Sequence, residues 1–360
     1  MQTDLPYTLA LSFQKGIGDI TARKIIQFFG SAQAAWNCKP KDLMQISGIG
    51  QQISKDFGNK KWLDLAFNEI EYCKNNQINI LTFYDEVYPQ LLKECIDAPL
   101  VIFCNGNLEF NQFNNKKISI VGTRKMTNYG RNFITELIEG LADFDVTIVS
   151  GLAYGCDIEA HTNALKNNVA TWSVMGTNFE RIYPASHKKV AVEMLQKGGW
   201  ITEQPSFKAV VPEAFLQRNR IIAGLSDITI VVESAFKGGS LVTAKFANEY
   251  NREVFALPGK STDALSIGCN YLIKSHQAYL VENSKDIIDY FNFNSKKKPK
   301  QIDLFIEFSD DENLIINGKQ HIDKMSFDLN LKSYELMPTL LDLELKQIIS
   351  TLPGKFYDLL

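Results

Sequence analysis

Residues 116–131 read "KKISIVGTRKMTNYGR", a short apolar run that ends in a glycine and leads into a helical pattern. Apolar runs between helices are typical of strands in a parallel sheet that is covered on both faces. A strand that ends in glycine before a helix is also a common way to build an anion site. The basic residues of this segment, which contains no acidic residue, are Lys116, Lys117, Arg124, Lys125 and Arg131. The anion is therefore either a small nucleotide or a phosphate of a nucleic acid.

The same pattern of strands and helices extends through residues 81–291. Strand-like runs occur at 118–122, 146–151, 171–176, 228–234 and 253–259. This alternation predicts an α/β fold with a doubly wound, mostly parallel sheet. Several runs end in glycine at the carboxyl edge of the sheet, where open α/β sheets bind ligands. The candidate binding residues at this edge are Gly122, Thr123, Ser150, Gly151, Gly176, Gly239 and Ser240.

The composition is that of an ordinary globular protein of 360 residues, with 45% hydrophobic and 22% charged residues. A net charge of -3 indicates that any nucleic-acid binding depends on a local patch. Six scattered cysteines without a CxxC pair and four histidines offer no zinc framework, so we expect no metal, no cofactor and a cytoplasmic location. No apolar run approaches the roughly 20 residues that span a bilayer, so we expect no membrane contact.

Residues 1–80 read as short helices punctuated by glycines and predict a small all-α domain. Gly16 and Gly18 precede a helical pattern, and Gly48 and Gly50 repeat the design. The apolar positions of the first pattern are Ile20, Ile25, Ile26 and Phe29. Such turns resemble helix-hairpin-helix (SAM-like) motifs, in which backbone N–H groups can hold a phosphate. The second turn has no lysine or arginine cluster, which favours a tight turn between helices there.

The C-terminal part of the chain begins with a polar, lysine-rich stretch at residues 292–304, which we interpret as a linker. Residues 305–360 then predict two or three amphipathic helices in a small winged-helix-like domain. Lysines are few in its second helical segment, and the preceding stretch at 310–312 is acidic. We therefore expect a protein-contact module at least as much as a DNA reader.

Three nucleotide-binding motifs are missing or incomplete in the middle region. A nicotinamide fingerprint needs G-x-G-x-x-G, but the next glycine after Gly122 is Gly130, and no P-loop sequence occurs. Phosphoribohydrolases of the lysine-decarboxylase-like class need a carboxylate early in the helix that follows a glycine pair. Here Thr243, Ala244 and Lys245 follow the pair Gly238-Gly239. Nucleotide hydrolysis is therefore poorly supported.

Two further clusters allow a functional and a structural interpretation. Asp157 and His161 lie four residues apart on one helix face. Because no third ligand or nucleophile is suitably spaced, we expect Asp157 to cap N–H groups and His161 to pack. Arg218 and Arg220 lie in a largely apolar helix. Either both pair with Glu203 or Glu233, or one of them faces the groove and contacts phosphate.

Basic and aromatic residues are interleaved in the segment 175–190, an arrangement that suits single-stranded nucleic acid. Lys188 and Lys189 follow His187 there, and Phe179 and Tyr183 lie nearby. For Tyr183, which precedes Pro184, we expect a place in the core.

Seven motifs follow one another along the chain in a fixed order. They are VGTR (121–124), SGLAYGCDIEAH (150–161), YPASHKK (183–189), ITEQP (201–205), FLQRNRIIAGLSD (215–227), VVESAFKGGSLVTA (231–244) and REVFALPG (252–259). In this order they resemble the DNA-processing protein A family, also called DprA or Smf. The resemblance covers essentially the whole chain, including the helix-hairpin-helix-like front and the winged-helix-like end.

This resemblance implies an extended Rossmann-like fold and a non-enzymatic role. Family members bind incoming single-stranded DNA during natural transformation, shield it, load RecA recombinase onto it, and work as homodimers through the Rossmann-like domain. By resemblance, Arg124 lines a positive DNA pocket, Lys188 or Lys189 contacts DNA, and Phe215 stacks on a base. Pro212 stands where some members have a basic residue, and Lys208 compensates for it.

On this interpretation the anion is a phosphate of single-stranded DNA, held by the Gly122 and Thr123 N–H groups and the Arg124 guanidinium, with Lys125 and Arg218 beside it. The alternative is an enzyme that acts on a nucleotide in the same groove through Asp157, His161 and Glu203. A third possibility is an adaptor whose C-terminal domain docks a partner while DNA binds only weakly.

Overall fold

The computed structural model describes residues 4–51, 53, 57–111, 115–293, 320–329, 331–345, 349–352 and 354–359. The chain forms two compact units, Met1–Asn294 and Ser295–Leu360. The predicted boundary near residue 80 falls inside the first unit, so this division stays a prediction. Most of the predicted linker lies outside the described residues.

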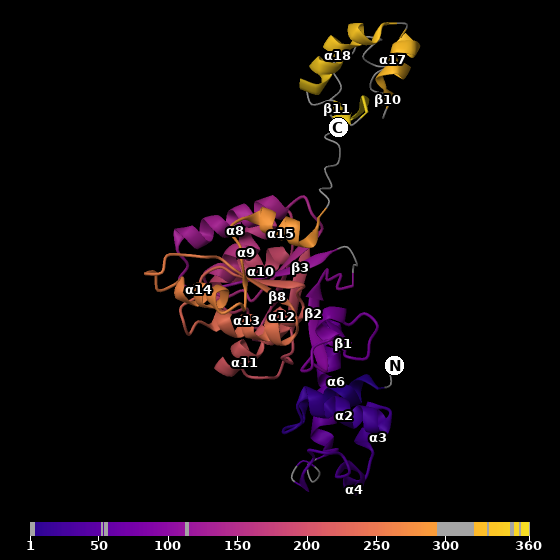
Figure 1. The fold of residues 1–360 in the computed structure, drawn as a ribbon. Helices are drawn as coiled ribbons and strands as arrows, with labels where there is room; N and C mark the ends of the chain where they lie inside the picture. Colours follow the sequence, from indigo (N-terminus) through magenta and orange to yellow (C-terminus); the bar gives the residue numbers. More distant parts are fainter. Residues whose placement is uncertain are drawn as a thin grey trace. The chain divides into compact units, whose positions relative to one another are not determined.

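A nine-stranded sheet forms the centre of the first unit (Figure 1). Its strands lie in the order β1-β2-β6-β5-β4-β3-β7-β8-β9. The strands are β1 (Asn79–Thr82), β2 (Val101–Gly106), β3 (Lys116–Val121), β4 (Val146–Ser150), β5 (Ala170–Val174), β6 (Gly198–Thr202), β7 (Ile228–Val231), β8 (Glu253–Ala256) and β9 (Tyr279–Leu280). The seven strands from β6 to β9 are parallel, whereas β1 and β2 pair antiparallel at one edge. The mostly parallel α/β sheet that the sequence predicts is confirmed.

The strand order reverses beside β3. From β3 the sheet runs through β4, β5 and β6 in one direction and through β7, β8 and β9 in the other. In register, Ile118 of β3 lies between Ile148 of β4 and Ile228 of β7. The loops after β3 and β7 therefore diverge toward opposite faces, which opens a crevice at the carboxyl edge.

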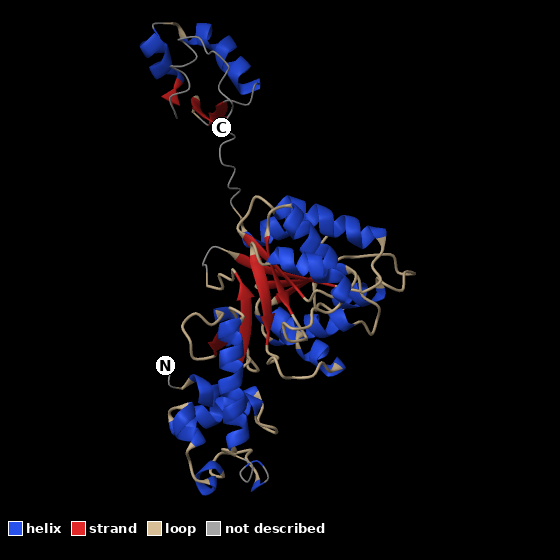
Figure 2. Ribbon diagram, turned by 180° about the vertical axis from the view of Figure 1, so that it is seen from behind, coloured by secondary structure: helices blue, strands red, loops and turns tan. Residues whose placement is uncertain are grey.

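Helices cover both faces of the sheet (Figure 2). Those of the first unit after β1 are α7 (Gln90–Lys93), α8 (Asn128–Leu141), α9 (Cys156–Lys166), α10 (Lys188–Met194), α11 (Pro212–Gln217), α12 (Asn219–Gly224), α13 (Gly239–Glu249), α14 (Ile267–Lys274) and α15 (Ser284–Phe291). One apolar core lies under α8, α9 and α15, and the other lies under α7, α12, α13 and α14. Successive strand residues point to opposite faces, so Ile120 joins the first core and Val121 joins the second.

The N-terminal helices pack against the sheet edge formed by β1 and β2 (Figure 1). They are α1 (Leu5–Phe13), α2 (Asp19–Phe29), α3 (Ala32–Trp36), α4 (Pro40–Leu43) and α6 (Lys60–Asn75). The helix predicted after Gly18 is present as α2, and Ile25 and Ile26 are buried as expected. Ile20 is 41% exposed, so its predicted place on the buried face is wrong. The helical pattern after Gly50 lies partly outside the described residues.

The second unit contains α17 (Ile322–Leu329), α18 (Ser333–Leu345) and an antiparallel sheet in the order β10-β12-β11. Its strands are β10 (Gln320–His321), β11 (Ile349–Leu352) and β12 (Phe356–Leu359). Two helices followed by a β-hairpin agree with the winged-helix-like prediction. Its small core consists of Ile322, Met325, Leu336, Leu340, Leu343, Ile349 and Tyr357. Across both units, none of the described helices has the length and apolar character that a membrane span requires.

Candidate nucleic-acid interface

A cavity of about 390 Å³ lies at the crevice where the strand order reverses. The loop after β3, the loop after β7, the end of α11 and the starts of α9, α12 and α13 form its walls. Seven of the predicted binding residues line it: Gly122, Thr123, Arg124, Phe215, Arg218, Gly239 and Ser240. Open α/β sheets bind ligands at this place, and the structure brings half of the predicted set together there.

The N terminus of α8, which follows the β3 loop, holds no free anion site. Glu233 accepts a hydrogen bond from the Thr127 backbone N–H at 2.9 Å and another from the Thr127 hydroxyl. The Thr123 N–H donates to the Glu233 carbonyl at 2.7 Å. The prediction that the Thr123 N–H holds a phosphate is therefore wrong, because a protein carbonyl already occupies that donor.

The N terminus of α13 offers donors on the opposite wall of the cavity. Its N-cap is Gly238, which has no side chain to satisfy the first N–H groups of the helix. Gly239 is exposed, and open space surrounds its α-carbon. Ser240 is buried and donates its hydroxyl to Ser234 Oγ at 2.9 Å. Together with the helix dipole, the free N–H groups favour a negative charge at this end of the cavity.

Arg124 supplies the accessible positive charge of this cavity. Lys116 and Arg131 pair with Asp227 and Glu159, and the Lys117 ammonium donates to the Asn115 carbonyl. Arg124 and Lys125, in contrast, are exposed and make no ion pair within the described part of the chain. A β-carbon at Gly155 would lie 2.2 Å from the Thr123 carbonyl oxygen, so the neighbouring loop packs directly against the Arg124 backbone.

Arg218 is a buried cation beneath the cavity. Its Nη1 donates to the Gly151 carbonyl at 2.6 Å and to the Val174 carbonyl. Burial lowers the pKa of Arg218 to about 10, and Asp157 opposes that shift. Asp157 in turn accepts from the N–H groups of Gly151 and Ala153 at 3.2 and 3.3 Å. Asp157 therefore caps N–H groups of the preceding loop, and the expected capping of the start of α9 itself is wrong.

His161 packs as a neutral side chain below this site. It is fully buried, and its Nδ1 lies 2.7 Å from the Thr171 hydroxyl, which itself donates to the Ile148 carbonyl. Nδ1 therefore carries the proton and donates to Thr171. Burial, reinforced by Arg218 and His187, lowers the pKa of His161 to about 3. The structural interpretation of Asp157 and His161 agrees with these contacts.

The two arginines of the Arg-Asn-Arg segment have different partners. Arg220 pairs with Asp19 at 3.1 Å and with Glu203, and it donates to the Asp97 carbonyl at 2.7 Å. Glu233 pairs with neither arginine, because Thr127 occupies it. Of the two carboxylates offered as arginine partners, Glu203 is confirmed for Arg220 and Glu233 is not. Asp19 also places a carboxylate at the start of α2, where a phosphate would otherwise bind.

The other seven predicted residues lie outside the cavity lining. Ser150, Gly151 and Gly176 are buried beneath it, and the Ser150 hydroxyl donates to the Ile120 carbonyl at 2.6 Å. Lys125 follows Arg124 on the surface, and Lys188 and Lys189 are exposed at the start of α10. Lys208 lines a different cavity of about 530 Å³ beside Gly18 and Arg220, so it does not join Arg124.

Tyr183 is an aromatic neighbour of the site that the sequence interpretation placed in the core. Its side chain is 54% exposed, and its ring centroid lies 5.4 Å from that of Phe215. Phe179, in contrast, packs against Trp200 in the core. The sequence did contain a sign of this position, because Tyr183 lies in a segment where aromatic and basic residues are interleaved.

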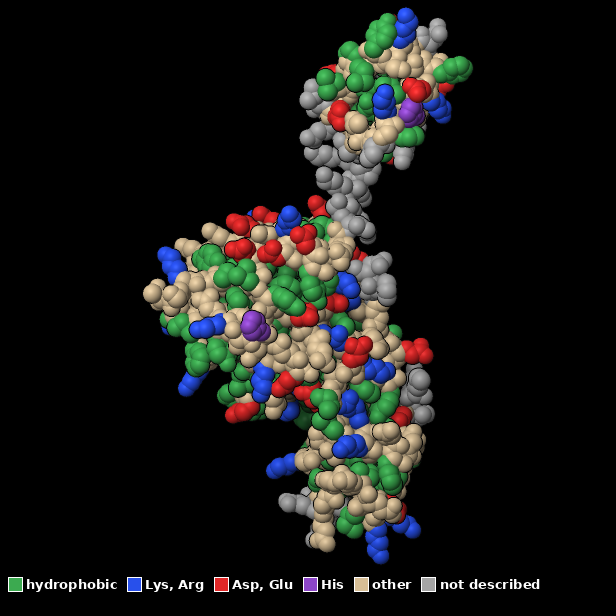
Figure 3. Space-filling model, in the orientation of Figure 1, with side chains coloured by type: hydrophobic (Ala, Val, Ile, Leu, Met, Phe, Trp, Pro, Cys, Tyr) green, Lys and Arg blue, Asp and Glu red, His purple; other side chains and the backbone are tan. Residues whose placement is uncertain are grey.

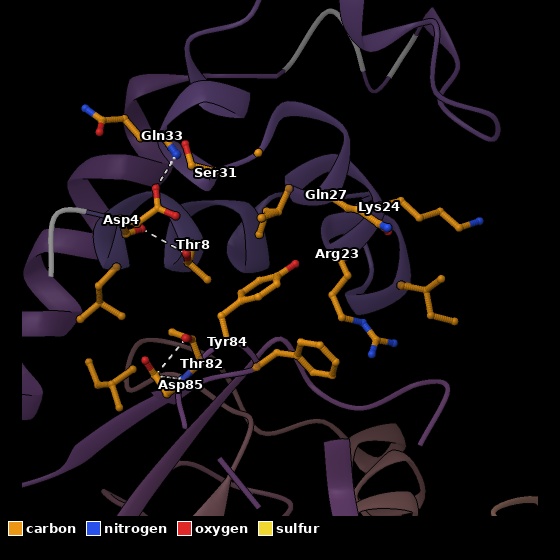
Figure 4. A pocket seen from close by; sticks show the side chains of 16 residues that line it. Asp4, Thr8, Arg23, Lys24, Gln27, Ser31, Gln33, Thr82, Tyr84 and Asp85 are labelled. Atoms are coloured by element: carbon orange, nitrogen blue, oxygen red, sulfur yellow. Dashed lines mark hydrogen bonds between the residues drawn. The ribbon is translucent and has the colours of Figure 1, made fainter. Parts of the chain in front are cut away.

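A larger cavity of about 1050 Å³ lies between the N-terminal helices and β1 (Figure 4). Asp4 caps α3 by accepting from Ala32 and Gln33, and Asp85 accepts from the Thr82 N–H and hydroxyl. Arg23 donates to the Ile96 carbonyl and lies over the Phe83 ring. These groups serve the local fold, and the wall carries as many carboxylates as cations, so we do not assign an anion to it.

Surface charge is distributed unevenly over the first unit. Acidic side chains gather over α8 and α15 (Figure 3), where Glu136, Glu139 and Asp289 are exposed. Exposed basic residues in the segments around the cavity include Arg124, Lys125, Lys188, Lys189 and Lys237. In the described ranges, no group of three or more His, Cys, Asp or Glu side chains is arranged to hold a metal ion.

Comparison with known proteins identifies the family. Residues 79–292 match the model of the family described as DNA recombination-mediator protein A. The chain is 34% identical over 281 residues to the protein Smf of Synechocystis. This alignment covers 77% of this chain and 70% of that protein. The chain is also 34% identical to the protein Smf of Escherichia coli over 75% of each chain. The chain therefore belongs to the DNA recombination-mediator protein A family.

Two solved structures share its fold. The DNA processing protein A of Streptococcus pneumoniae matches with a TM-score of 0.67 and 29% identity, over 80% of this chain and 99% of that one. The DNA processing protein A of Helicobacter pylori, whose structure describes a single-stranded DNA binding mode, matches with a TM-score of 0.54 and 30% identity. That match covers 60% of this chain and 96% of the other.

Proposed function

We propose that this protein binds single-stranded DNA at the carboxyl edge of its sheet and delivers it to RecA recombinase. The observation that carries the proposal is the exposed Arg124, which makes no ion pair with any described residue and shares a cavity with the open N terminus of α13 and with Phe215. Cation, N–H donors and an aromatic ring are what a phosphate and its base require. The single-stranded DNA binding mode of the Helicobacter pylori relative supports the same ligand.

The proposed contacts follow from these positions. Arg124 and the first N–H groups of α13, at Gly239 and Ser240, hold a phosphate, and Phe215 stacks on a base. Lys125, Lys188 and Lys189 attract neighbouring phosphates from the surface. Gly122 makes room for the Cys156 side chain, because a β-carbon at Gly122 would lie 2.3 Å from Cys156 Sγ, and Arg218 fixes the backbone around Gly151. Thr123, Ser150 and Gly176 shape the floor of the site, and Lys208 serves a separate part of the surface.

RecA loading and a role in natural transformation are the parts of the proposal that rest on the family. A recombination mediator has to hand its strand to a recombinase, and weak base preference suits a strand of any sequence. RecA loading is measured as the time that RecA needs to begin hydrolysing ATP on DNA coated with single-strand binding protein. We expect this protein to shorten that lag, and an unchanged lag would contradict the loading role.

A homodimer through the Rossmann-like domain is part of the same proposal. β9 is the last strand of the sheet and pairs only with β8 among the described strands. Open strand edges pair readily with other chains, and exposed apolar side chains lie on β9, on the preceding helix α14 and beside Tyr271 of that helix. These side chains are Phe236, Ile267, Tyr271, Tyr279 and Leu280, each at least 41% exposed.

The C-terminal unit suits a protein partner more than DNA. α18 contains Glu335, Asp342 and Glu344 but no lysine or arginine. Tyr334, Met337 and Leu341 are exposed on the same helix. An acidic helix with exposed apolar side chains would be repelled by DNA phosphates, so we propose that this unit docks a protein. Deleting residues after 292 should leave single-strand binding intact, and lost binding would contradict this division of roles.

The enzyme alternative has little support in the site. Ser240 and Thr243 are the α13 side chains that line the cavity beside Gly239, so this helix places no carboxylate there. Asp157 is held by two N–H groups, His161 stays neutral, and Glu203 pairs with Arg220. We propose a non-enzymatic, cytoplasmic protein that needs no cofactor and no metal. Release of a base or phosphate from nucleoside monophosphates would contradict that proposal.

The proposal is tested by fluorescence anisotropy with a labelled oligonucleotide, offered as a single strand and as a duplex. We expect tighter binding of the single strand and a dissociation constant that rises steeply with salt, because phosphate contacts release counterions. Equal binding of both forms, or binding that ignores salt, would contradict a site built from Arg124 and helix N–H groups.

A further inference from the structure

Two exposed tyrosines extend the aromatic wall that Phe215 begins. Tyr183 packs beside Phe215, and Tyr154 immediately precedes Gly155, whose backbone touches that of Thr123 and Arg124. Tyr154 is 48% exposed and Tyr183 is 54% exposed. Three separate segments of the chain thus place aromatic rings around the Arg124 cavity. We call Tyr154, Tyr183 and Phe215 the aromatic rim.

The Tyr154 ring is fixed before any ligand arrives. His187 lies edge-on to it, with ring centroids 4.9 Å apart and an interplanar angle of 75°. The Ser186 hydroxyl donates to the Tyr154 hydroxyl at 3.4 Å, and His187 is itself anchored by a 2.8 Å hydrogen bond between Nδ1 and the Leu152 carbonyl. A ring that is already ordered loses little entropy when it binds a flat ligand.

The Tyr183 ring contacts the Phe215 ring at an angle and does not stack over it. The two planes are inclined by 58°, so they form no parallel stack that would exclude a third ring. Lys188 and Lys189 follow a few residues after Tyr183, and both are exposed. Cations therefore flank the rim on two sides, with Arg124 at the cavity and the lysine pair at the start of α10.

We propose that Tyr154 and Tyr183 stack on bases of the same single strand whose phosphate Arg124 holds. This inference rests on the proposed function and extends it, because it assigns base contacts to two residues outside the cavity lining. The strand runs from the cavity across the rim toward Lys188 and Lys189. Because every base has a flat π-face, the rim holds bases without choosing among them.

The test separates base contacts from phosphate contacts. Dissociation constants are measured for labelled oligothymidine and for a strand of equal length and charge whose central positions are abasic. We expect Tyr154→Ala and Tyr183→Ala each to weaken binding of oligothymidine about fivefold or more. Both should bind the abasic strand as the wild type does. Tyr183→Phe keeps the ring and should bind both strands normally.

Tyr334→Ala is the matched control, because Tyr334 is an exposed tyrosine on α18 of the C-terminal unit, to which no DNA contact is assigned. If the alanine variants bind oligothymidine as tightly as the wild type, the rim takes no part and the inference is wrong. If wild-type protein binds no single strand at all, the proposed function fails first. Should Tyr183→Ala not fold, Tyr183→Leu replaces it, since leucine fills the space but presents no π-face.

Discussion

The guanidinium of Arg218 lies directly against the α-carbon of Gly151, so that a β-carbon there would be 2.2 Å from Nη1. The same guanidinium group donates to the Gly151 carbonyl. The glycine at the end of β4 therefore makes room for a buried cation, and it is this cation that holds the loops of the carboxyl edge in place. The glycine therefore supports the proposed DNA site through packing and not through contact with a phosphate.

Gly151→Ala should destabilise the protein, because the new methyl group collides with Arg218. Overpacking of a filled interior costs about 1–3 kcal/mol of unfolding free energy. Gly239→Ala is the control, since open space surrounds the α-carbon of Gly239. Urea unfolding monitored by circular dichroism measures both variants. Equal stability of Gly151→Ala and wild type would show that Arg218 is not held as tightly as the contacts indicate.

Arg220→Met should cost about 3–5 kcal/mol, because it leaves Glu203 and Asp19 without their buried partner. The Arg220 and Glu203 side chains are only 12% and 14% exposed, so water cannot replace the lost pair. Lys245→Ala breaks the exposed pair with Glu249 and should change the unfolding free energy by less than about 0.5 kcal/mol. Thermal and urea unfolding of both variants would reveal the difference, and similar losses would contradict the burial argument.

His161 should make the protein lose stability as the pH falls below about 6.5. The folded state holds the pKa of this histidine at about 3, whereas the unfolded chain binds the proton at its ordinary value of 6.5. Protonation therefore favours unfolding throughout that window, by about 2 kcal/mol at about pH 5. Urea unfolding at neutral and mildly acid pH should show a smaller pH dependence for His161→Gln than for wild type. His276→Gln, at an exposed histidine, should keep the wild-type dependence.

The sequence predicted the parallel strands whose residues are apolar and β-branched, and these are β3, β4, β5, β7 and β8. It did not indicate β6, because Gly198 and Gly199 lower the strand propensity of a segment that is nevertheless buried. The carboxyl ends of the parallel strands could be predicted as the binding edge of the sheet, and seven of the predicted binding residues line one cavity there. Hydrogen-bond partners are set by tertiary contacts between distant segments, so the capture of the Thr123 N–H by the Glu233 carbonyl could not be predicted. The position of Tyr183 could not be predicted either, because its ring contacts Phe215 of α11, a residue from a distant part of the sequence.

Leu280→Asp should convert a dimer into a monomer if β9 forms the dimer interface. The substitution places a charge at the open edge of the sheet, where two copies would pair and bury their apolar side chains. Light scattering after size-exclusion chromatography measures the mass directly. Leu341→Asp, on α18 of the C-terminal unit, is the control and should leave the mass unchanged. A wild-type protein that is monomeric at all concentrations would refute the homodimer.

Binding of single-stranded DNA by Arg124→Ala is the most direct test of the proposed site. Anisotropy of a labelled single strand is measured at several salt concentrations for the wild type, for Arg124→Ala and for Lys285→Ala, a control at an exposed lysine on α15. We expect Arg124→Ala to weaken binding about tenfold or more and to reduce the salt slope by about one phosphate contact, while Lys285→Ala binds as the wild type does. If Arg124→Ala binds with wild-type affinity and an unchanged slope, the carboxyl edge is not where this protein holds DNA.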